Sequence, residues 1–158
     1  MTTRRRFMKS SLTTAAAMAA PLSLVRGVHA AGSDKIKIGL IGCGGRGSGA
    51  AVNAMNAGPD VTLVAMADIF EDRATGARER LKKLKPEQTA VDDDHLFVGF
   101  DAYQKVIDSV DVVLIAAASH FHPAYLKAAV AADKHVFCEK PHGLDAPGLK
   151  VAMAAGAE

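Results

Sequence analysis

The chain has 158 residues, of which 49% are apolar and 5% aromatic, with two cysteines and no tryptophan. This composition is typical of a globular domain and excludes a disordered, collagen-like or disulfide-stapled chain. Five of the 19 basic residues lie within residues 1–31, where no acidic residue occurs, so the remaining body has 14 basic and 17 acidic residues and a net charge of −3. The body also lacks a basic stripe interleaved with aromatic residues, and we expect no nucleic-acid partner.

Residues 1–30 have the three-part layout of a cleaved export signal. A basic start leads into an Ala-rich stretch and a small-residue end at Ala30, and residues 3–9 resemble the twin-arginine signal. Serines, threonines and a proline dilute the apolar stretch, so we expect a signal and no membrane anchor. These features predict passage through the twin-arginine export machinery, cleavage after Ala30 and a periplasmic or otherwise exported body. That route carries folded proteins, often with a cofactor already inside.

Apolar, β-rich runs alternate five times with helix-compatible segments in the rest of the chain. The expected strands are residues 35–41, 61–67, 96–98, 112–116 and 135–138. Helices are expected after the glycine-rich turn and before Gly58, over residues 70–84, after Asp101, from Pro123, and after Asp145. Such alternation requires a parallel sheet with right-handed crossovers and helices on both faces.

We therefore predict an α/β fold of the Rossmann type, a doubly wound parallel sheet of strand order 3-2-1-4-5, over residues 34–158. The final helix has no strand after it, although its crossover should return to an edge strand. We expect from this that the chain is a fragment lacking the last edge strand and a carboxyl-terminal α/β domain.

The pattern Gly42-x-Gly44-x-x-Gly47 follows the first predicted strand and opens a helix. In that context it indicates a dinucleotide-binding fingerprint, with a glycine-rich turn that binds no ligand as the alternative. Gly42 permits the tight turn, Gly44 lets the backbone approach a diphosphate, and Gly47 lets helix and sheet pack closely. The amides of the helix N-terminus would bind the diphosphate.

Asp68 ends the second predicted strand, 21 residues after the last glycine. A carboxylate there can accept both ribose hydroxyls of the adenosine half and would repel a 2′-phosphate, which favours NAD over NADP. Arg46 and Arg73 could each neutralise a phosphate, so NADP stays possible.

Two further clusters follow the fourth and fifth predicted strands, at residues 116–122 and 139–142. In a 3-2-1-4-5 sheet, the carboxyl ends of the strands share one edge, and ligands bind in the crevice between strands one and four. The glycine turn, Asp68 and both clusters are therefore expected to face one edge.

Structural explanations for the same clusters stay open. His120 and His122 could cap the helix that Pro123 begins, and they lack the further ligands of a zinc site, so we expect no metal. Glu139 and Lys140 could form a surface ion pair. Residues 92–94, three aspartates, are expected in a solvated loop. The two cysteines, Cys43 and Cys138, end strands that are not neighbours, so we expect no disulfide between them.

From residue 35 onward the chain resembles the amino-terminal domain of the Gfo/Idh/MocA family of glucose-fructose oxidoreductase and inositol dehydrogenase. Residues 41–47, 120–122 and, above all, 135–141 carry the resemblance. It implies that the Glu-Lys-Pro motif borders the nicotinamide, that its proline follows a cis peptide bond, and that Lys140 is the catalytic residue that hydrogen-bonds the reacting hydroxyl. The candidate dinucleotide-binding residues are Gly42, Gly44, Gly45, Arg46, Gly47, Asp68, Ala117, Ser119, His122 and Glu139.

The chain departs from the family where Ala117 and Ala118 replace the usual Thr-Pro, which predicts a less rigid loop. The family also continues into a second α/β domain that supplies the substrate pocket and usually a catalytic histidine, and through which it commonly forms homo-oligomers. We therefore expect this chain to hold the dinucleotide without completing a turnover.

The resemblance implies an NAD(P)-dependent oxidoreductase that transfers a hydride from a carbinol of a sugar or cyclitol. One alternative is an NAD-dependent glycosidase of the same family, which oxidises a ring hydroxyl only transiently. The other is a non-catalytic protein that binds a dinucleotide or a sugar in the same crevice.

Overall fold

The computed structural model describes residues 35–157. The export signal and the cleavage site predicted for residues 1–30 lie outside the described residues. The strands are β1 (Ile36–Ile41), β2 (Val61–Asp68), β3 (Leu96–Val98), β4 (Val112–Ile115) and β5 (His135–Cys138). The helices are α2 (Gly45–Met55), α3 (Glu71–Leu84), the short 3-10 helix η2 (Pro86–Gln88), α4 (Ala102–Ser109), α5 (His122–Ala131) and α6 (Ala146–Ala155).

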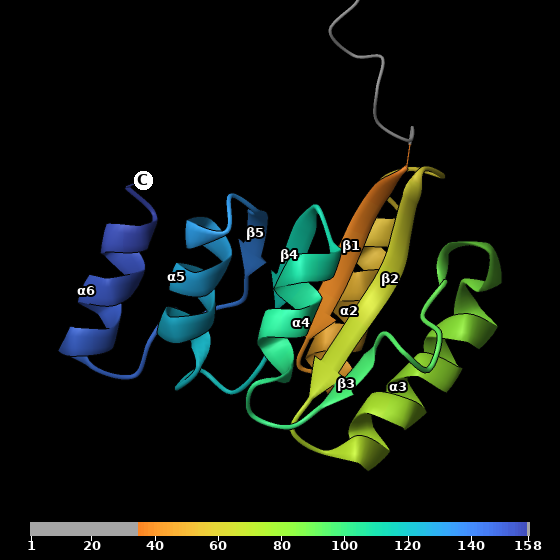
Figure 1. Cartoon of the computed structure of the whole chain (residues 1–158), viewed down its shortest axis with the longest axis horizontal. Coiled ribbons are helices and arrows are strands. Elements are labelled where there is room, and N and C mark those ends of the chain that lie inside the picture. Colours follow the sequence, from red (N-terminus) through yellow and green to blue (C-terminus); the bar gives the residue numbers. More distant parts are fainter. Residues whose placement is uncertain (1–34, 158) are drawn as a thin grey trace, which may run out of the picture. The chain divides into compact units, whose positions relative to one another are not determined.

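The five strands form one parallel sheet of order β3-β2-β1-β4-β5, as the alternation of strands and helices predicts (Figure 1). The chain leaves β1 for α2 and β2 on one side, then crosses to β4 and β5 on the other side. This reversal after β3 opens a crevice between the carboxyl ends of β1 and β4, where ligands bind in open α/β sheets.

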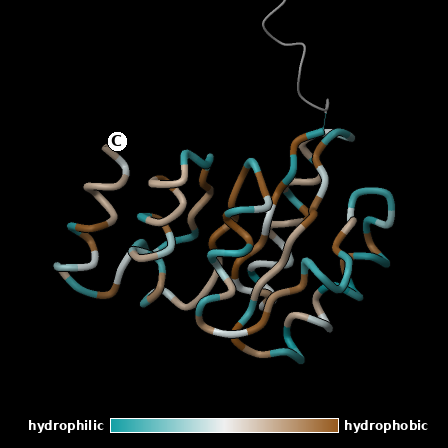
Figure 2. Tube along the Cα trace, viewed as in Figure 1, coloured by the Kyte–Doolittle hydropathy of each residue, from teal (hydrophilic) through white to brown (hydrophobic). Residues whose placement is uncertain are grey.

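Two apolar layers, one on each face of the sheet, hold the helices. Leu40, Leu63 and Met66 lie in the layer beneath α2 and α3, while Ile41 and Ile115 lie in the layer beneath α4 and α5. Figure 2 shows apolar residues along the central strands and hydrophilic ones on much of α3. Burial on both faces explains why β2 reads as a continuous apolar run.

Gly39 allows α4 to lie close over β1. A Cβ atom at this position would come within 2.5 Å of Val106 Cγ1 and 2.9 Å of Val110 Cγ1. The register between β1 and β2 also shifts between Ile38 and Gly39. Gly39, three residues before the glycine turn, is thus required for the close packing of α4 on β1.

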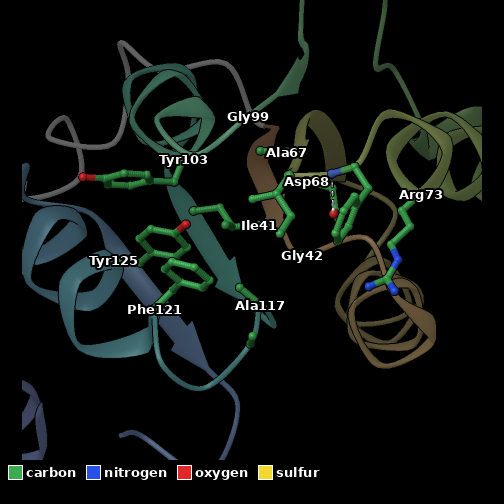
Figure 3. Close-up of a pocket in the computed structure, with 13 residues that line it drawn as sticks. Ile41, Gly42, Ala67, Asp68, Arg73, Gly99, Tyr103, Ala117, Phe121 and Tyr125 are labelled. Carbon is green, nitrogen blue, oxygen red and sulfur yellow. Dashed lines mark hydrogen bonds between the residues drawn. The ribbon is translucent and has the colours of Figure 1, made fainter.

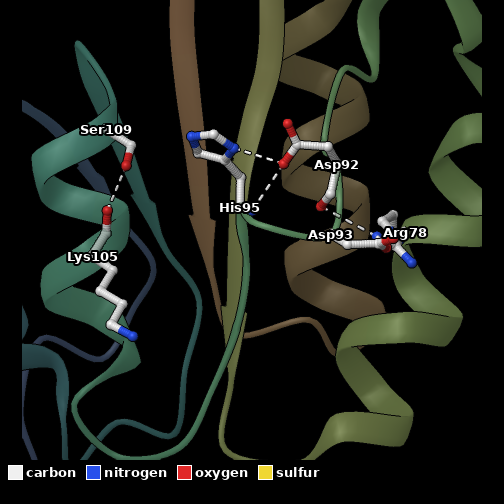
Figure 4. A network of polar contacts seen from close by, with 6 residues as sticks. All are labelled: Arg78, Asp92, Asp93, His95, Lys105 and Ser109. Carbon is white, nitrogen blue, oxygen red and sulfur yellow. Dashed lines mark hydrogen bonds and ion pairs between the residues drawn. The ribbon is translucent and has the colours of Figure 1, made fainter.

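The loop between α3 and β3 contains a helical turn and a polar network that the sequence pattern did not indicate. Gln88 Nε2 lies 2.8 Å from Met55 O and 2.9 Å from Gly58 O. In Figure 4, Asp92 Oδ1 accepts hydrogen bonds from the backbone N and ring Nδ1 of His95, at 2.9 and 2.6 Å. The His95 hydrogen bond lowers the pKa of the Asp92 carboxyl. These contacts brace the amino-terminal approach to β3, away from the strands' carboxyl ends.

Asp145 and Asp101 both occupy N-cap positions, but only one side chain acts as a cap. Asp145 Oδ1 accepts a hydrogen bond of 2.7 Å from Gly148 N at the start of α6. Asp101 makes no side-chain capping hydrogen bond to α4. Within residues 35–157, every helix is too short or too polar to span a bilayer.

Candidate functional site

The turn after β1 has the backbone geometry that the glycine fingerprint predicts. Gly42 has a φ of 97°, and a Cβ there would lie 2.5 Å from Ala117 N, so the turn touches the loop after β4. At Gly47 a Cβ would lie 1.9 Å from Gly42 O. These two glycines therefore bring β1, the start of α2 and the β4 loop into direct contact.

The N-terminus of α2 is open to a ligand. Gly44 is the N-cap residue, and no side chain caps the helix. A Cβ at Gly44 or at Gly45 would meet no atom within 4 Å, so space remains beside this backbone. Uncapped amides and the partial positive charge of a helix N-terminus suit an anion such as a diphosphate. This cradle fits the group that the fingerprint predicts.

Asp68, at the end of β2, is fixed by two backbone amides. Its Oδ2 accepts from Cys43 N at 2.7 Å, and its Oδ1 accepts from Phe70 N at 3.0 Å. An ionised carboxylate offers about four acceptor positions, so two stay available for a ligand's hydroxyl groups. The carboxylate is thus oriented beside the glycine turn before any ligand arrives.

A cavity of about 160 Å³ lies at this edge of the sheet, between the end of β2 and the loop after β4 (Figure 3). Asp68, Phe70 and Arg73 line one side, and Arg73 lies over the Phe70 ring at 5.0 Å. Pockets that enclose a whole drug-sized ligand measure about 300–1,000 Å³. The cavity therefore suits one part of a larger ligand, such as a single ring system.

Stacked aromatic side chains from α4 and α5 form the other side of this cavity (Figure 3). The ring centroids of Tyr103 and Tyr125 are 4.2 Å apart, and those of Phe121 and Tyr125 are 5.6 Å apart with nearly parallel planes. Burial is the main cause that raises the pKa of Tyr125, so its hydroxyl stays protonated. Phe121 belongs to residues 116–122, which were expected at this edge, but Tyr103 and Tyr125 were not among the predicted site residues. The available signal was the spacing of Phe121 and Tyr125, one helical turn apart where the loop after β4 enters α5.

The loop after β5 is joined to the glycine turn by an ion pair. The Arg46 guanidinium at the start of α2 pairs with Oε1 of Glu139, whose side chain is only 9% exposed. The partner of Glu139 is therefore Arg46, not the adjacent Lys140. Lys140 itself is exposed, and the bond between Lys140 and Pro141 is cis, as the resemblance implies.

The predicted site residues in the loop after β4 differ in how exposed they are and in what they contact. Ala117 lines the cavity, and Ser119 is half-buried in the bend that leads into α5. His120 is exposed, with its ring edge-on to Phe121 at 5.4 Å. His122 is buried with 1% exposure, and its ring faces two backbone carbonyl groups and caps no helix.

Both cysteines are free thiols. Burial is the largest cause that raises the pKa of Cys43 to about 12 and that of Cys138 to about 11. Nucleophilic chemistry requires the thiolate, so neither group is activated. Among residues 35–157, no three His, Cys, Asp or Glu side chains gather in a way that could hold a metal ion.

The contacts above connect every predicted cluster along the carboxyl edge of the sheet. The glycine turn contacts Asp68 through Cys43, the β4 loop through Gly42, and the β5 loop through Arg46. A cavity that suits a single ring system, an open helix N-terminus and an exposed lysine thus lie along this edge. Such an arrangement is that of a dinucleotide-binding domain of a doubly wound fold.

Comparison with known proteins gives the family. Residues 36–155 match the Gfo/Idh/MocA family, described as an oxidoreductase family with an NAD-binding Rossmann fold, and the chain belongs to this family. An inositol 2-dehydrogenase of Acidothermus cellulolyticus is 35% identical over 113 residues, which are 72% of this chain and 30% of that enzyme. A glycosyl hydrolase family 109 protein of Streptomyces coelicolor is 31% identical over 117 residues, which are 73% of this chain and 24% of that protein.

Solved structures show the same fold. The scyllo-inositol dehydrogenase of Lactobacillus casei with bound NAD(H) and scyllo-inositol superposes with a TM-score of 0.61 at 28% identity, over 78% of this chain and 33% of that one. The 3-ketoreductase KijD10 of Actinomadura kijaniata in complex with NADP gives a TM-score of 0.58 at 28% identity, over 78% of this chain and 36% of that one. The chain thus spans about a quarter to a third of the length of these relatives.

Proposed function

We propose that this chain is the dinucleotide-binding part of an NAD-dependent oxidoreductase that acts on a carbinol of a sugar or cyclitol. The observation that carries the proposal is the shared edge that holds the open N-terminus of α2, the Asp68 carboxylate and Lys140. Membership of the Gfo/Idh/MocA family and the inositol dehydrogenases among its relatives support the substrate class.

Different residues of this chain bind the different parts of NAD. The amides at Gly44 and Gly45 bind the diphosphate, where space is open beside the backbone. Asp68 accepts the hydroxyls of the adenosine ribose with its two remaining acceptor positions. The adenine ring enters the cavity between Phe70 and the aromatic wall of Tyr125, where ring stacking adds to apolar burial.

Asp68 also sets the preference between NAD and NADP. Its carboxylate is held in place by two amides and cannot turn away from a 2′-phosphate without losing both hydrogen bonds. The Arg73 guanidinium over the Phe70 ring is the one group in the cavity lining that could offset this repulsion. We therefore propose NAD as the cofactor, with weaker binding of NADP.

Lys140 holds the reacting hydroxyl group of the substrate. A bound nicotinamide would supply the acceptor for the hydride that leaves the carbinol carbon. The Lys140 ammonium donates a hydrogen bond to the carbinol oxygen and stabilises the negative charge that develops there, while a base outside this chain takes the proton. The ion pair between Glu139 and Arg46 keeps the backbone before Lys140 against the glycine turn.

A glycosidase that oxidises its substrate only transiently is the second candidate function. The observation that favours it is the similarity to two glycosyl hydrolase family 109 proteins, at 31% and 30% identity. We further propose that residues 1–30 direct export through the twin-arginine machinery, and that the complete protein is a homo-oligomer. An exported compartment lacks a free NAD pool, so the bound cofactor would be regenerated within a redox-neutral cycle.

Turnover by the complete protein tests the proposal. We expect purified full-length protein to oxidise an inositol or a sugar with reduction of NAD, and Lys140→Ala to lower kcat by orders of magnitude while NAD binding persists. Release of a chromogenic leaving group from a glycoside without an added acceptor would favour the glycosidase. Undiminished turnover in Lys140→Ala would remove Lys140 from the mechanism. Bound NAD that never changes redox state with any sugar would indicate a non-catalytic binding protein.

A further inference from the structure

His122 ties together two loops that are distant in sequence. It is the first residue of α5, and its side chain is buried with 1% exposure. Its Nε2 lies 2.9 Å from Ala117 O, and its Nδ1 lies 2.8 Å from Pro141 O. Both partners are backbone carbonyl oxygens, which only accept hydrogen bonds. An imidazolium ring donates to both carbonyls, and a neutral ring donates to one of them.

Each carbonyl belongs to a different part of the site. Ala117 lines the cavity beside Asp68, and its backbone N would touch a Cβ on Gly42. Pro141 directly follows Lys140. One buried imidazole therefore lies between the loop that faces the dinucleotide and the loop that carries the exposed lysine.

Other contacts hold the two ends of the Lys140 loop, residues 139–144. Glu139 N donates a hydrogen bond of 2.9 Å to Ile115 O at the end of β4, and the Glu139 side chain pairs with Arg46. A Cβ at Gly143 would lie 3.2 Å from Leu149 N and 3.5 Å from Pro123 Cγ. Between these ends, the ring of His122 ties Pro141 to the loop after β4.

The same geometry argues against a direct role for His122 in holding the dinucleotide. Both ring nitrogens already face backbone carbonyls, and His122 is not among the residues that line the cavity. Its effect on a ligand must therefore pass through Ala117 and Pro141.

We propose that His122 is a positioning residue that couples dinucleotide binding at the β4 loop to the placement of Lys140. The inference rests on the proposed function of this edge as a dinucleotide site. A ligand that fixes the Ala117 loop fixes the imidazole, and the imidazole fixes Pro141 and the lysine before it. Because such coupling is reciprocal, an ordered Lys140 loop also strengthens dinucleotide binding.

Two conservative variants separate the contact of His122 with Pro141 O from its contact with Ala117 O. The amide nitrogen of asparagine occupies the position of Nδ1, so His122→Asn keeps a donor for Pro141 O only. The amide nitrogen of glutamine occupies the position of Nε2, so His122→Gln keeps a donor for Ala117 O only. His120→Asn is the matched control, since His120 lies in the same loop, is exposed and has its ring edge-on to Phe121.

The readouts are the Kd for NAD by calorimetry and the hydrogen exchange of the amides of residues 139, 140 and 142–144, both measured on the 158-residue chain. In the wild type and in His120→Asn, we expect saturating NAD to slow exchange in this segment. His122→Gln should lose the slowing by NAD and raise the Kd by at most about threefold, the reciprocal effect of the lost coupling. His122→Asn should raise the Kd by about 5- to 10-fold, the effect of one lost hydrogen bond, while exchange of the segment without NAD stays as in the wild type.

The outcomes separate this inference from the proposed function. If the wild type binds no nicotinamide dinucleotide, the proposed function fails and the inference falls with it. If the wild type binds NAD but the Asn and Gln variants change both readouts alike, or change neither, the positioning role of His122 is wrong. Circular dichroism checks that each variant is folded. Each variant keeps a hydrogen-bond donor to one of the two carbonyl oxygens, so we expect both variants to fold.

Discussion

The Gly47→Ala substitution measures how tightly α2 is held against the glycine turn. The added Cβ would lie 1.9 Å from the carbonyl oxygen of Gly42 and 3.1 Å from its carbonyl carbon. Both are backbone atoms, so the helix or the turn must move. Overpacking costs about 1–3 kcal/mol, and so short a contact belongs at the upper end, whereas alanine's helix propensity returns about 1 kcal/mol. We expect a net loss of about 2 kcal/mol in the free energy of unfolding.

Gly49→Ala in the same helix is the matched control. A Cβ at Gly49 would meet no atom within 4 Å, so only the helix propensity changes, and we expect a gain of about 0.5–1 kcal/mol. Urea denaturation followed by circular dichroism gives both free energies under one set of conditions. Equal stabilities of the two variants, or a more stable Gly47→Ala, would refute the close approach of α2 to the turn.

The remaining predictions concern a thiol, an ion pair and a helix cap. Burial raises the pKa of Cys43 to about 12 from 9.0, so we expect iodoacetamide to leave this thiol unmodified at pH 8 unless urea is added. We also expect the free energy of unfolding to fall as pH rises from 9 towards 12, because the Cys43 thiol ionises at a lower pH in the unfolded chain than in the folded one. In urea titrations, Arg46→Met should destabilise the fold more than Glu139→Gln does, by about 1–3 kcal/mol, because Arg46→Met leaves the buried Glu139 carboxylate unpaired. A larger loss of stability in Glu139→Gln would contradict the pairing. Asp145→Ala should lower the thermal midpoint through a loss of about 0.5–2 kcal/mol, while Asp101→Ala, which loses no capping hydrogen bond, should leave it nearly unchanged.

The sequence predicted the sheet because its signals are local. The apolar run of β2 and the glycine at 42 each report a requirement of the backbone around them, namely burial on both faces and a positive φ. Strand order follows from these elements through the rule of right-handed crossovers. The bounds of the strands accordingly differ from those expected by only a residue, as where β4 ends at Ile115 and not at residue 116.

Side-chain partners at the site could not be predicted in the same way. Glu139 has Lys140 next to it in the sequence, yet its partner is Arg46, which the parallel pairing of β4 with β5 and the start of α2 bring near. Tyr125 has the helical spacing of a core residue, and only the fold shows that its ring also lines a cavity. His122 was expected to touch a ligand, and the folded chain instead directs its ring to two carbonyls. Such choices depend on three-dimensional neighbours that spacing along the chain does not encode.

Calorimetric titration of the 158-residue chain with NAD and with NADP tests the central claim most directly, with Asp68→Ala as the comparison. We predict saturable binding of NAD that is tighter than that of NADP. In Asp68→Ala, we expect NAD affinity to fall by about tenfold or more, because hydrogen bonds to a charged carboxylate are each worth about 1.5–3 kcal/mol, and the advantage over NADP to shrink. A folded wild-type chain that gives no heat with either dinucleotide would contradict the assignment of this edge of the sheet.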